Sequence, residues 1–106
     1  MDAQLRALAA PRRRQILELV RERELAAGEI AAHFDVTRPA VSQHLALLRE
    51  AGLLAERRVG TRRLYRADST GLAGLKQFVD RFWAAGLERL KDEAEAEASR
   101  RRTTST

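Results

Sequence analysis

The side chains best suited to polar chemistry gather in the middle of this chain. Ser42, Gln43 and His44 are consecutive, and Thr37 and Arg38 precede them at the start of the same predicted helix. A glutamine amide can pair bidentately with adenine and an arginine with guanine, while helix N-termini attract phosphate. We expect Gln43 and then Arg38 to read bases, and Ser42 and His44 to hold phosphates. Thr37 is also expected to contact DNA, because it lies at the helix end that approaches base edges or phosphates. The alternative for Gln43 is an exposed helical residue without a role.

Arginines form a second cluster around Gly60, which supplies the turn of a predicted two-stranded hairpin. The cluster comprises Arg57, Arg58, Arg62 and Arg63. Like charges that face one another across a hairpin repel, and phosphates would neutralise them. The alternative is a charged edge hairpin that resists strand pairing. Leu54 and Leu64, one on each strand, are expected to pack on the helices.

Composition narrows the classes of protein that the chain can be. It has 106 residues, no cysteine and a net charge of +5, from 20 Lys and Arg against 15 Asp and Glu. The excess of positive charge favours an anionic partner, although a GC-rich genome would also enrich arginine. A chain of this length forms one modest core, and no nucleophile, base and orienting group can be assembled from its residues. We therefore expect no enzyme activity.

No segment approaches the roughly 18 apolar residues that a membrane span needs, and no apolar signal segment follows Met1. We expect a cytoplasmic protein without a membrane partner.

The elements that must position these side chains follow from hydrophobic spacing. Apolar residues recur at helical intervals, as in Ile16, Leu17 and Val20, or Val41, Leu45 and Leu48. The expected elements are a short helix around Leu5 and Leu8, helices over 11–23, 28–34 and 38–51, strands over 53–58 and 62–67, and a last helix from 69 or 70 to the mid-nineties. This order predicts a mostly α winged helix-turn-helix (α-α-α-α-β-β-α) with a small two-stranded hairpin.

Local sequence signals mark the ends of the two central helices. Asp35 can adopt the left-handed conformation that the turn after residue 34 needs, and Thr37 can cap the next helix. Gly52 can end that helix as its C′ residue, with Leu53 as the accompanying apolar contact.

The last helix carries apolar residues over about half of its circumference, which is more than one small core needs. We expect a homodimer formed through the first and last helices. The expected interface residues are Leu5, Leu8, Leu75, Val79, Phe82, Trp83 and Leu90. Phe82 and Trp83 could instead line a ligand pocket. The predicted organisation is a DNA-binding and dimerisation domain over 1–98 and a disordered basic tail over 99–106.

The run Val-Ser-Gln-His-Leu over 41–45, with Leu48 and Ala-Gly-Leu at 51–53, resembles the ArsR (arsenic-repressor) family. The resemblance covers roughly residues 5–90. It implies a dimeric repressor whose second motif helix enters the major groove of double-stranded DNA and whose wing reaches the backbone or minor groove. Two-fold symmetry would require a near-palindromic operator.

The chain departs from that family at its sensor positions. The family's cysteine pair is missing from residues 28–34, which excludes sensing through sulfur. Asp80, Glu88 and Asp92 on the last helix have no histidine beside them, and zinc prefers nitrogen or sulfur ligands. We expect no metal or cofactor, and the effector stays unknown. The alternatives are a sequence-independent nucleoid-type protein and a winged-helix module for protein contact.

Overall fold

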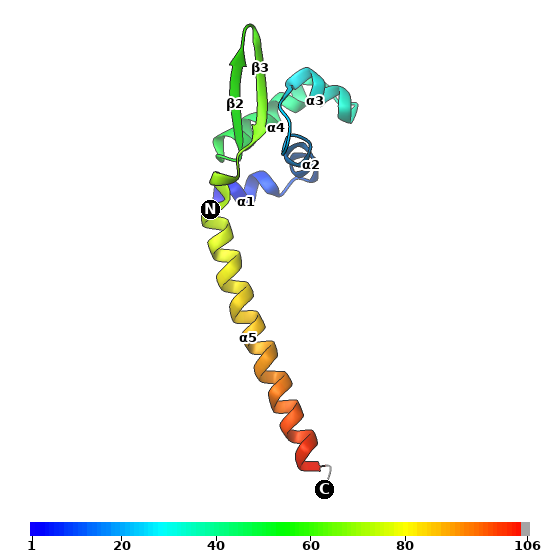
Figure 1. Ribbon diagram of the computed structural model, residues 1–106. Helices are drawn as coiled ribbons and strands as arrows, with labels where there is room; N and C mark the ends of the chain where they lie inside the picture. Colours follow the sequence, from blue (N-terminus) through cyan, green and yellow to red (C-terminus); the bar gives the residue numbers. More distant parts are fainter. Residues whose placement is uncertain (105–106) are drawn as a thin grey trace. The chain divides into compact units, whose positions relative to one another are not determined.

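The computed structural model describes residues 1–104, with side chains described as far as Arg102. The chain divides into a first unit, Met1–Leu75, and a second unit, Lys76–Thr106. The elements are α1 (Asp2–Leu8), α2 (Pro11–Leu19), β1 (Leu25–Ala26), α3 (Ala27–Phe34), α4 (Arg38–Glu50), β2 (Leu54–Val59), β3 (Arg62–Ala67), the 3₁₀ helix η1 (Ser69–Leu72) and α5 (Ala73–Thr104). The predicted winged helix-turn-helix is confirmed (Figure 1).

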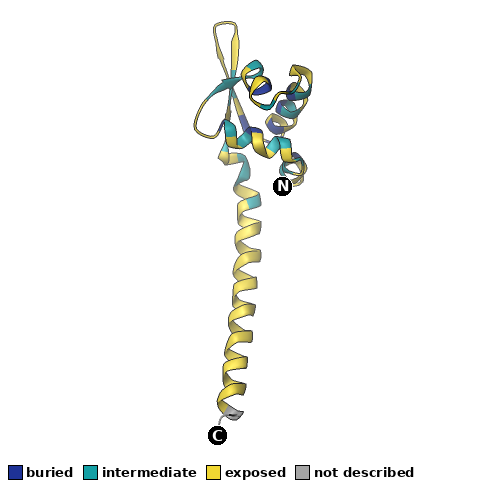
Figure 2. Ribbon diagram, turned by 90° about the vertical axis from the view of Figure 1, so that its right-hand side faces the viewer, coloured by how far each residue is buried: buried dark blue, intermediate teal, exposed yellow. Residues whose placement is uncertain are grey.

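The helices of the first unit pack around one small core. Its fully buried large side chains are Ile16, Val20, Ile30, Val41, Leu48 and Leu53. They come from α2 and the residue that caps its end, from α3 and α4, and from the segment after α4, and Figure 2 shows buried positions on the helices of this unit. Burying one such side chain stabilises the fold by about 1.5–3 kcal/mol. The apolar spacing that predicted α2 and α4 therefore marks the core.

The turn between α3 and α4 has the geometry that its sequence predicts. Asp35 lies in the left-handed region at φ 54°. The Val36 N–H donates to the Ala31 carbonyl at 3.1 Å, which closes α3. Thr37 Oγ1 accepts from the Ala40 N–H at 3.4 Å and so caps α4. These contacts hold the start of α4 at a defined place beside α3.

The end of α4 is closed in the same way. Gly52 has φ 75°, and its N–H donates to the Arg49 carbonyl at 3.0 Å. The Leu53 N–H reaches back to the Leu48 carbonyl at 3.0 Å, and the Leu53 side chain is buried. This arrangement is a Schellman motif, so the predicted role of Gly52 is confirmed.

The sheet has three strands in the order β1-β3-β2, one more than predicted. β1 pairs antiparallel with β3 through Leu25–Tyr65 and Ala26–Leu64. A strand of two residues is too short to show alternation, which is why the sequence did not reveal it. The predicted end of α2 is also corrected, because the helix stops at Leu19 and residues 20–23 form a turn and bends before β1.

The wing is the hairpin formed by β2 and β3, and its strand register corrects one predicted core contact. Leu54 pairs with Ala67 and Glu56 with Tyr65, so these residues share a face of the hairpin. Leu54 is buried as expected, and Tyr65 packs against the core with it. The prediction that Leu64 packs on the helices with Leu54 is wrong, because Leu64 pairs with Arg57 on the opposite face.

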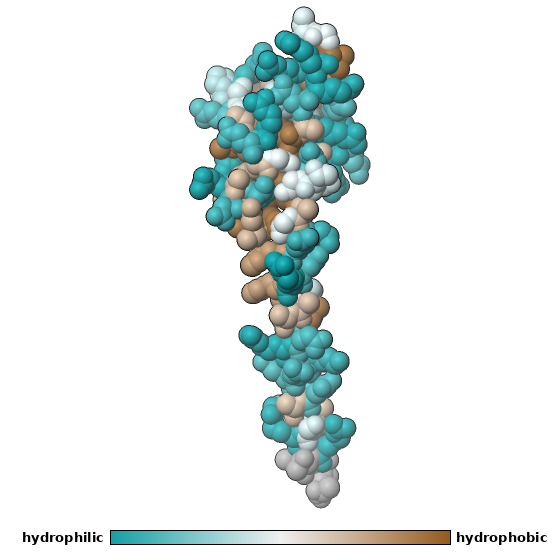
Figure 3. All heavy atoms as spheres, turned by 90° about the vertical axis from the view of Figure 1, so that its left-hand side faces the viewer, coloured by the Kyte–Doolittle hydropathy of each residue, from teal (hydrophilic) through white to brown (hydrophobic). Residues whose placement is uncertain are grey.

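The second unit consists of α5 after Leu75. Its first half exposes large apolar side chains, and polar residues predominate beyond them (Figure 3). α5 continues to Thr104 and includes residues 99–104, where we predicted a disordered tail, while residues 105–106 lie outside the described part. Glu97 pairs with Arg100 at 2.8 Å and with Arg101 at 3.3 Å, which favours helix there. Within the described residues, no helix is both long and apolar enough to cross a membrane.

Candidate nucleic-acid interface

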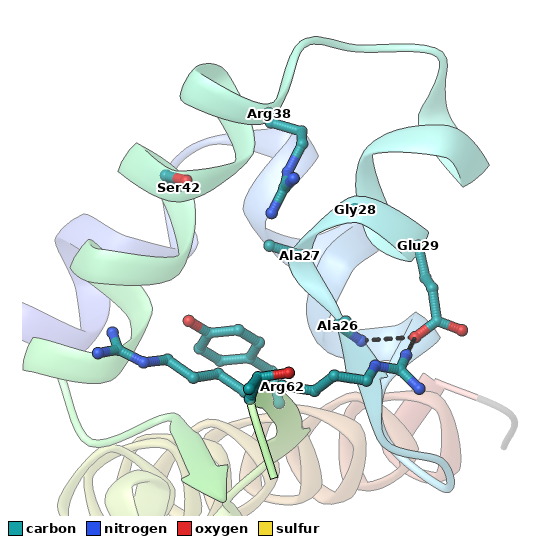
Figure 4. Close-up of a pocket in the computed structure, with 10 residues that line it drawn as sticks. Ala26, Ala27, Gly28, Glu29, Arg38, Ser42 and Arg62 are labelled. Atoms are coloured by element: carbon teal, nitrogen blue, oxygen red, sulfur yellow. Dashed lines mark hydrogen bonds and ion pairs between the residues drawn. The ribbon is translucent and has the colours of Figure 1, made fainter. Parts of the chain in front are cut away.

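An open hollow of about 560 Å³ lies between the starts of α3 and α4 and the wing. Its polar lining includes Arg38, Ser42, Arg62, Arg63, Tyr65 and Glu29 (Figure 4). Arg38 and Ser42 of α4, the predicted recognition helix, therefore line the same hollow as two arginines of the predicted wing. With Thr61, which also lines the hollow, three guanidinium groups and three hydroxyl groups surround this concave surface, and all are donors suited to phosphate oxygens.

Arg38 extends from the first turn of α4 into this hollow, toward Ala27 (Figure 4). An ideal Cβ at Gly28 would lie 3.8 Å from Arg38 Nε and 3.9 Å from Arg38 Cζ. The guanidinium of Arg38 thus lies over a glycine of α3 at ordinary contact distance.

Arg62 crosses from the wing to α3. Its Nη2 donates to Glu29 Oε1 at 2.5 Å, and the same oxygen accepts the Ala26 N–H at 3.0 Å. Figure 4 shows both interactions at the edge of the hollow. Glu29 therefore fixes the position of a wing arginine.

A second hollow of about 210 Å³ continues the surface along α4 and shares Ser42, Arg63 and Tyr65 with the first. Arg63 Nε lies 3.5 Å from Glu56 Oε1, and Arg49 of α4 forms an ion pair with the same carboxylate. The basic surface therefore runs from the start of α4 to its last turn.

Arg57 and Arg58, the other two wing arginines, differ in whether a carboxylate pairs with them. Arg57 Nε donates to Glu24 Oε2 at 3.0 Å. Arg58 stands opposite Arg63 in the hairpin register, and no carboxylate among the described side chains pairs with it. Three of the four wing arginines thus have internal carboxylate partners, none of which the sequence analysis singled out.

The remaining recognition-helix residues lie outside the hollow. Thr37 and Gln43 are exposed. His44 follows Ser42 by about 200° around the helix and faces α2, where its Nδ1 is 3.4 Å from Arg13 Nη1. The structure does not bring His44 together with Ser42.

The surroundings of His44 disfavour the protonated form of its imidazole. Partial burial, followed by the positive charges of Arg13 and Arg12, holds the pKa of His44 below its usual value of 6.5. Arg13 also donates to the Ala7 carbonyl at 2.6 Å, so its guanidinium is fixed beside the ring.

No group of three or more His, Cys, Asp or Glu side chains in the described part of the chain could hold a metal ion.

Comparison with known proteins finds relatives that are named as regulators of transcription. Residues 10–56 match the model described as bacterial regulatory protein, arsR family. The HTH-type transcriptional regulator Rv2034 of Mycobacterium tuberculosis is 49% identical over 86 residues, which are 81% of this chain and 80% of that protein. The transcriptional repressor SdpR of Bacillus subtilis is 35% identical over 72 residues, 68% of this chain and 80% of the repressor.

Solved structures agree with these relatives. A crystal structure of a possible transcriptional regulator for arsenical resistance has a TM-score of 0.69 and 43% identity, covering 86% of this chain and 95% of that one. The homodimeric winged helix-turn-helix DNA-binding domain of Mb0332 from Mycobacterium bovis has a TM-score of 0.63 and 34% identity, covering 78% and 77%. On these matches and on its fold, the chain belongs to the arsR family of bacterial regulatory proteins.

Proposed function

We propose that this protein is a transcriptional repressor that binds a near-palindromic operator as a homodimer in the cytoplasm. One observation carries the proposal. Arg38 and Ser42 of α4 and Arg62 and Arg63 of the wing line one hollow, although the two pairs are about twenty residues apart in sequence. A duplex with α4 in its major groove would bring a phosphate to that hollow.

The recognition contacts divide into positioning and reading. Ser42, Arg62 and Arg63 hold phosphates, while Gln43 and Arg38 read bases from the N-terminal half of α4. Thr37 caps α4 and lies exposed beside these residues. We assign His44 to the contact between α4 and α2 in place of the phosphate contact expected from its sequence position.

The exposed apolar face of α5 supports a homodimer. Phe82 and Trp83 are 72% and 66% exposed, and with Gly86, Leu87 and Leu90 they form a hollow of about 300 Å³ on the helix. An uncovered face of this kind marks an interaction surface, and a gap at a glycine accepts a side chain of a facing helix. The proposed interface contains Leu5, Leu8, Leu75, Val79, Phe82, Trp83 and Leu90.

The direction of regulation is proposed from relatives. SdpR and SmtB are named repressors, while HlyU of Vibrio cholerae, which is 34% identical over 79 residues, is named an activator. A promoter fusion distinguishes the two directions, because deletion of the gene raises transcription under a repressor and lowers it under an activator.

Selection of genomic fragments with the purified protein at stated salt tests the proposal. We expect an enriched near-palindrome that binds at least about 10³-fold more tightly than random duplex. A ratio within about tenfold, with no enriched site, would instead identify a nucleoid-type protein. Arg38→Ala and Arg63→Ala should weaken binding, and unchanged affinity in both variants would identify a module for protein contact.

A further inference from the structure

We propose that Glu29 is a specificity-determining residue that holds Arg62 in the free protein and releases it to a phosphate only when α4 is correctly seated on DNA. The proposal rests on the proposed function. It concerns a carboxylate on α3, outside the residues assigned to DNA contact.

The carboxylate is held by its own helix. Glu29 is the third residue of α3, and its Oε1 accepts the N–H of Ala26, the residue that precedes the helix, at 3.0 Å. The positive end of the helix dipole also favours an anion at this position. Arg62, in contrast, arrives from the tip of the wing through a flexible side chain. When the pair separates, Arg62 therefore moves and Glu29 stays.

A phosphate can displace Glu29 from its ion pair with Arg62. The side chains of Glu29 and Arg62 are 48% and 59% exposed, and exposed ion pairs are weak and screened by salt. An incoming phosphate can therefore take the place of the carboxylate.

The position of Glu29 makes this exchange conditional. Glu29 lines the same hollow as Arg38 and Ser42, so a phosphate there meets two favourable groups and one that repels it. A phosphate held close to Ser42 by the base contacts of Gln43 and Arg38 gains Arg62 at short range. A loosely placed phosphate on random DNA meets the repulsion without that gain. Glu29 should thus weaken binding to random DNA more than binding to the operator.

Arg58 provides the contrast within the same wing. It has no carboxylate partner among the described side chains, so it should contact phosphates whatever the sequence. Each neutralised phosphate changes the slope of log affinity against log salt by about 0.9. On random DNA, Arg58 should therefore neutralise a phosphate and Arg62 should not.

The experiment compares Glu29→Gln with Glu18→Gln in the full chain. Glutamine at position 29 still accepts the Ala26 N–H, and Glu18 is an exposed carboxylate of α2 that does not line the hollow, so both variants change the net charge equally. The probes are a random duplex and the most enriched genomic fragment. We expect Glu29→Gln to tighten random binding by about threefold or more beyond Glu18→Gln, with a smaller change for the enriched fragment.

Salt titrations on the random duplex supply the second measurement. Arg62→Gln should leave the slope unchanged in the wild-type background and lower it by about 0.9 in the Glu29→Gln background. Arg58→Gln should lower the slope by about 0.9 in both backgrounds. Unfolding midpoints of all variants check that each one is folded.

Two results would overturn the proposal: equal effects of Glu29→Gln and Glu18→Gln on both DNAs, or an equal loss of slope on removing Arg62 in both backgrounds. A wild-type protein without a preferred fragment would instead contradict the proposed function. The salt titrations on random duplex would still decide whether Glu29 withholds Arg62.

Discussion

Gly71 of η1 lies directly against the backbone of Gly52 at the end of α4. A Cβ at Gly71 would lie 1.9 Å from the Gly52 carbonyl oxygen and 2.5 Å from its carbonyl carbon. The Asp68 N–H donates to the Leu53 carbonyl at 2.9 Å, which holds the two segments together. Glycine at position 71 is therefore what allows the segment after the wing to return to the end of the recognition helix.

We predict that Gly71→Ala lowers the free energy of unfolding by about 1–3 kcal/mol, because the backbone must shift to admit the methyl group. Gly74→Ala is the matched control. A Cβ at Gly74 meets nothing within 4 Å, and alanine favours helix by up to about 1 kcal/mol. Urea unfolding measures both variants. A Gly71→Ala protein as stable as the wild type would contradict the close approach.

Asp35→Gly should raise the free energy of unfolding by about 1 kcal/mol, because Asp35 occupies the left-handed region at φ 54° and glycine does so without steric cost. Asp35→Val should lower stability, since a β-branched side chain is disfavoured there. Thermal unfolding ranks the three proteins. The explanation fails if the glycine variant melts below the wild type.

His44 should make stability depend on pH. Because burial, Arg13 and Arg12 hold its pKa below 6.5, the unfolded chain binds a proton that the folded chain does not as the pH falls past that value. The free energy of unfolding should therefore decrease below about pH 6.5. His44→Gln should reduce this decrease in urea titrations at several pH values. His33→Gln controls for the other histidine, and identical pH profiles for all three proteins would contradict the prediction.

Phe82→Glu should shift the protein from dimer to monomer in sedimentation velocity, because a carboxylate at a buried interface loses its hydration. Gln77 lies on the opposite side of α5 at 100° per residue, so Gln77→Glu adds the same charge and should leave the dimer intact. Equal behaviour of the two variants would place the dimer contact elsewhere. A wild-type monomer that binds an apolar small molecule at Phe82 and Trp83 would favour the ligand-pocket alternative.

Much of the first unit could be predicted from local sequence signals. Helical spacing marked α4, and Thr37 and Gly52 marked its ends, because caps and apolar stripes depend on residues close in sequence. The choice between Leu64 and Tyr65 depends on the pairing of β3 with its neighbours, which a single strand does not reveal. β1 was missed for the same reason.

The basic residues of the site could be predicted from the sequence, but their acidic partners could not. Arg38, Ser42, Arg62 and Arg63 could be selected by residue type. Glu29 becomes a partner of Arg62 only through tertiary packing, since the two residues are 33 positions apart. The contact of His44 with Arg13 likewise joins α4 to α2, which no local pattern shows.

The carbonyl contacts at the end of α1 join this helix to the rest of the first unit. A helix of seven residues is not stable alone in water, and α1 depends on Arg13 and Arg14, which donate to the Ala7 and Leu8 carbonyls at 2.6 Å each. Gln4 in turn donates to the Ala51 carbonyl at the end of α4 at 2.7 Å. Trimming the N-terminus to Pro11 would therefore deprive α2 and α4 of partners at once, and we expect a recombinant domain that begins there to be less stable than one with its opening residues.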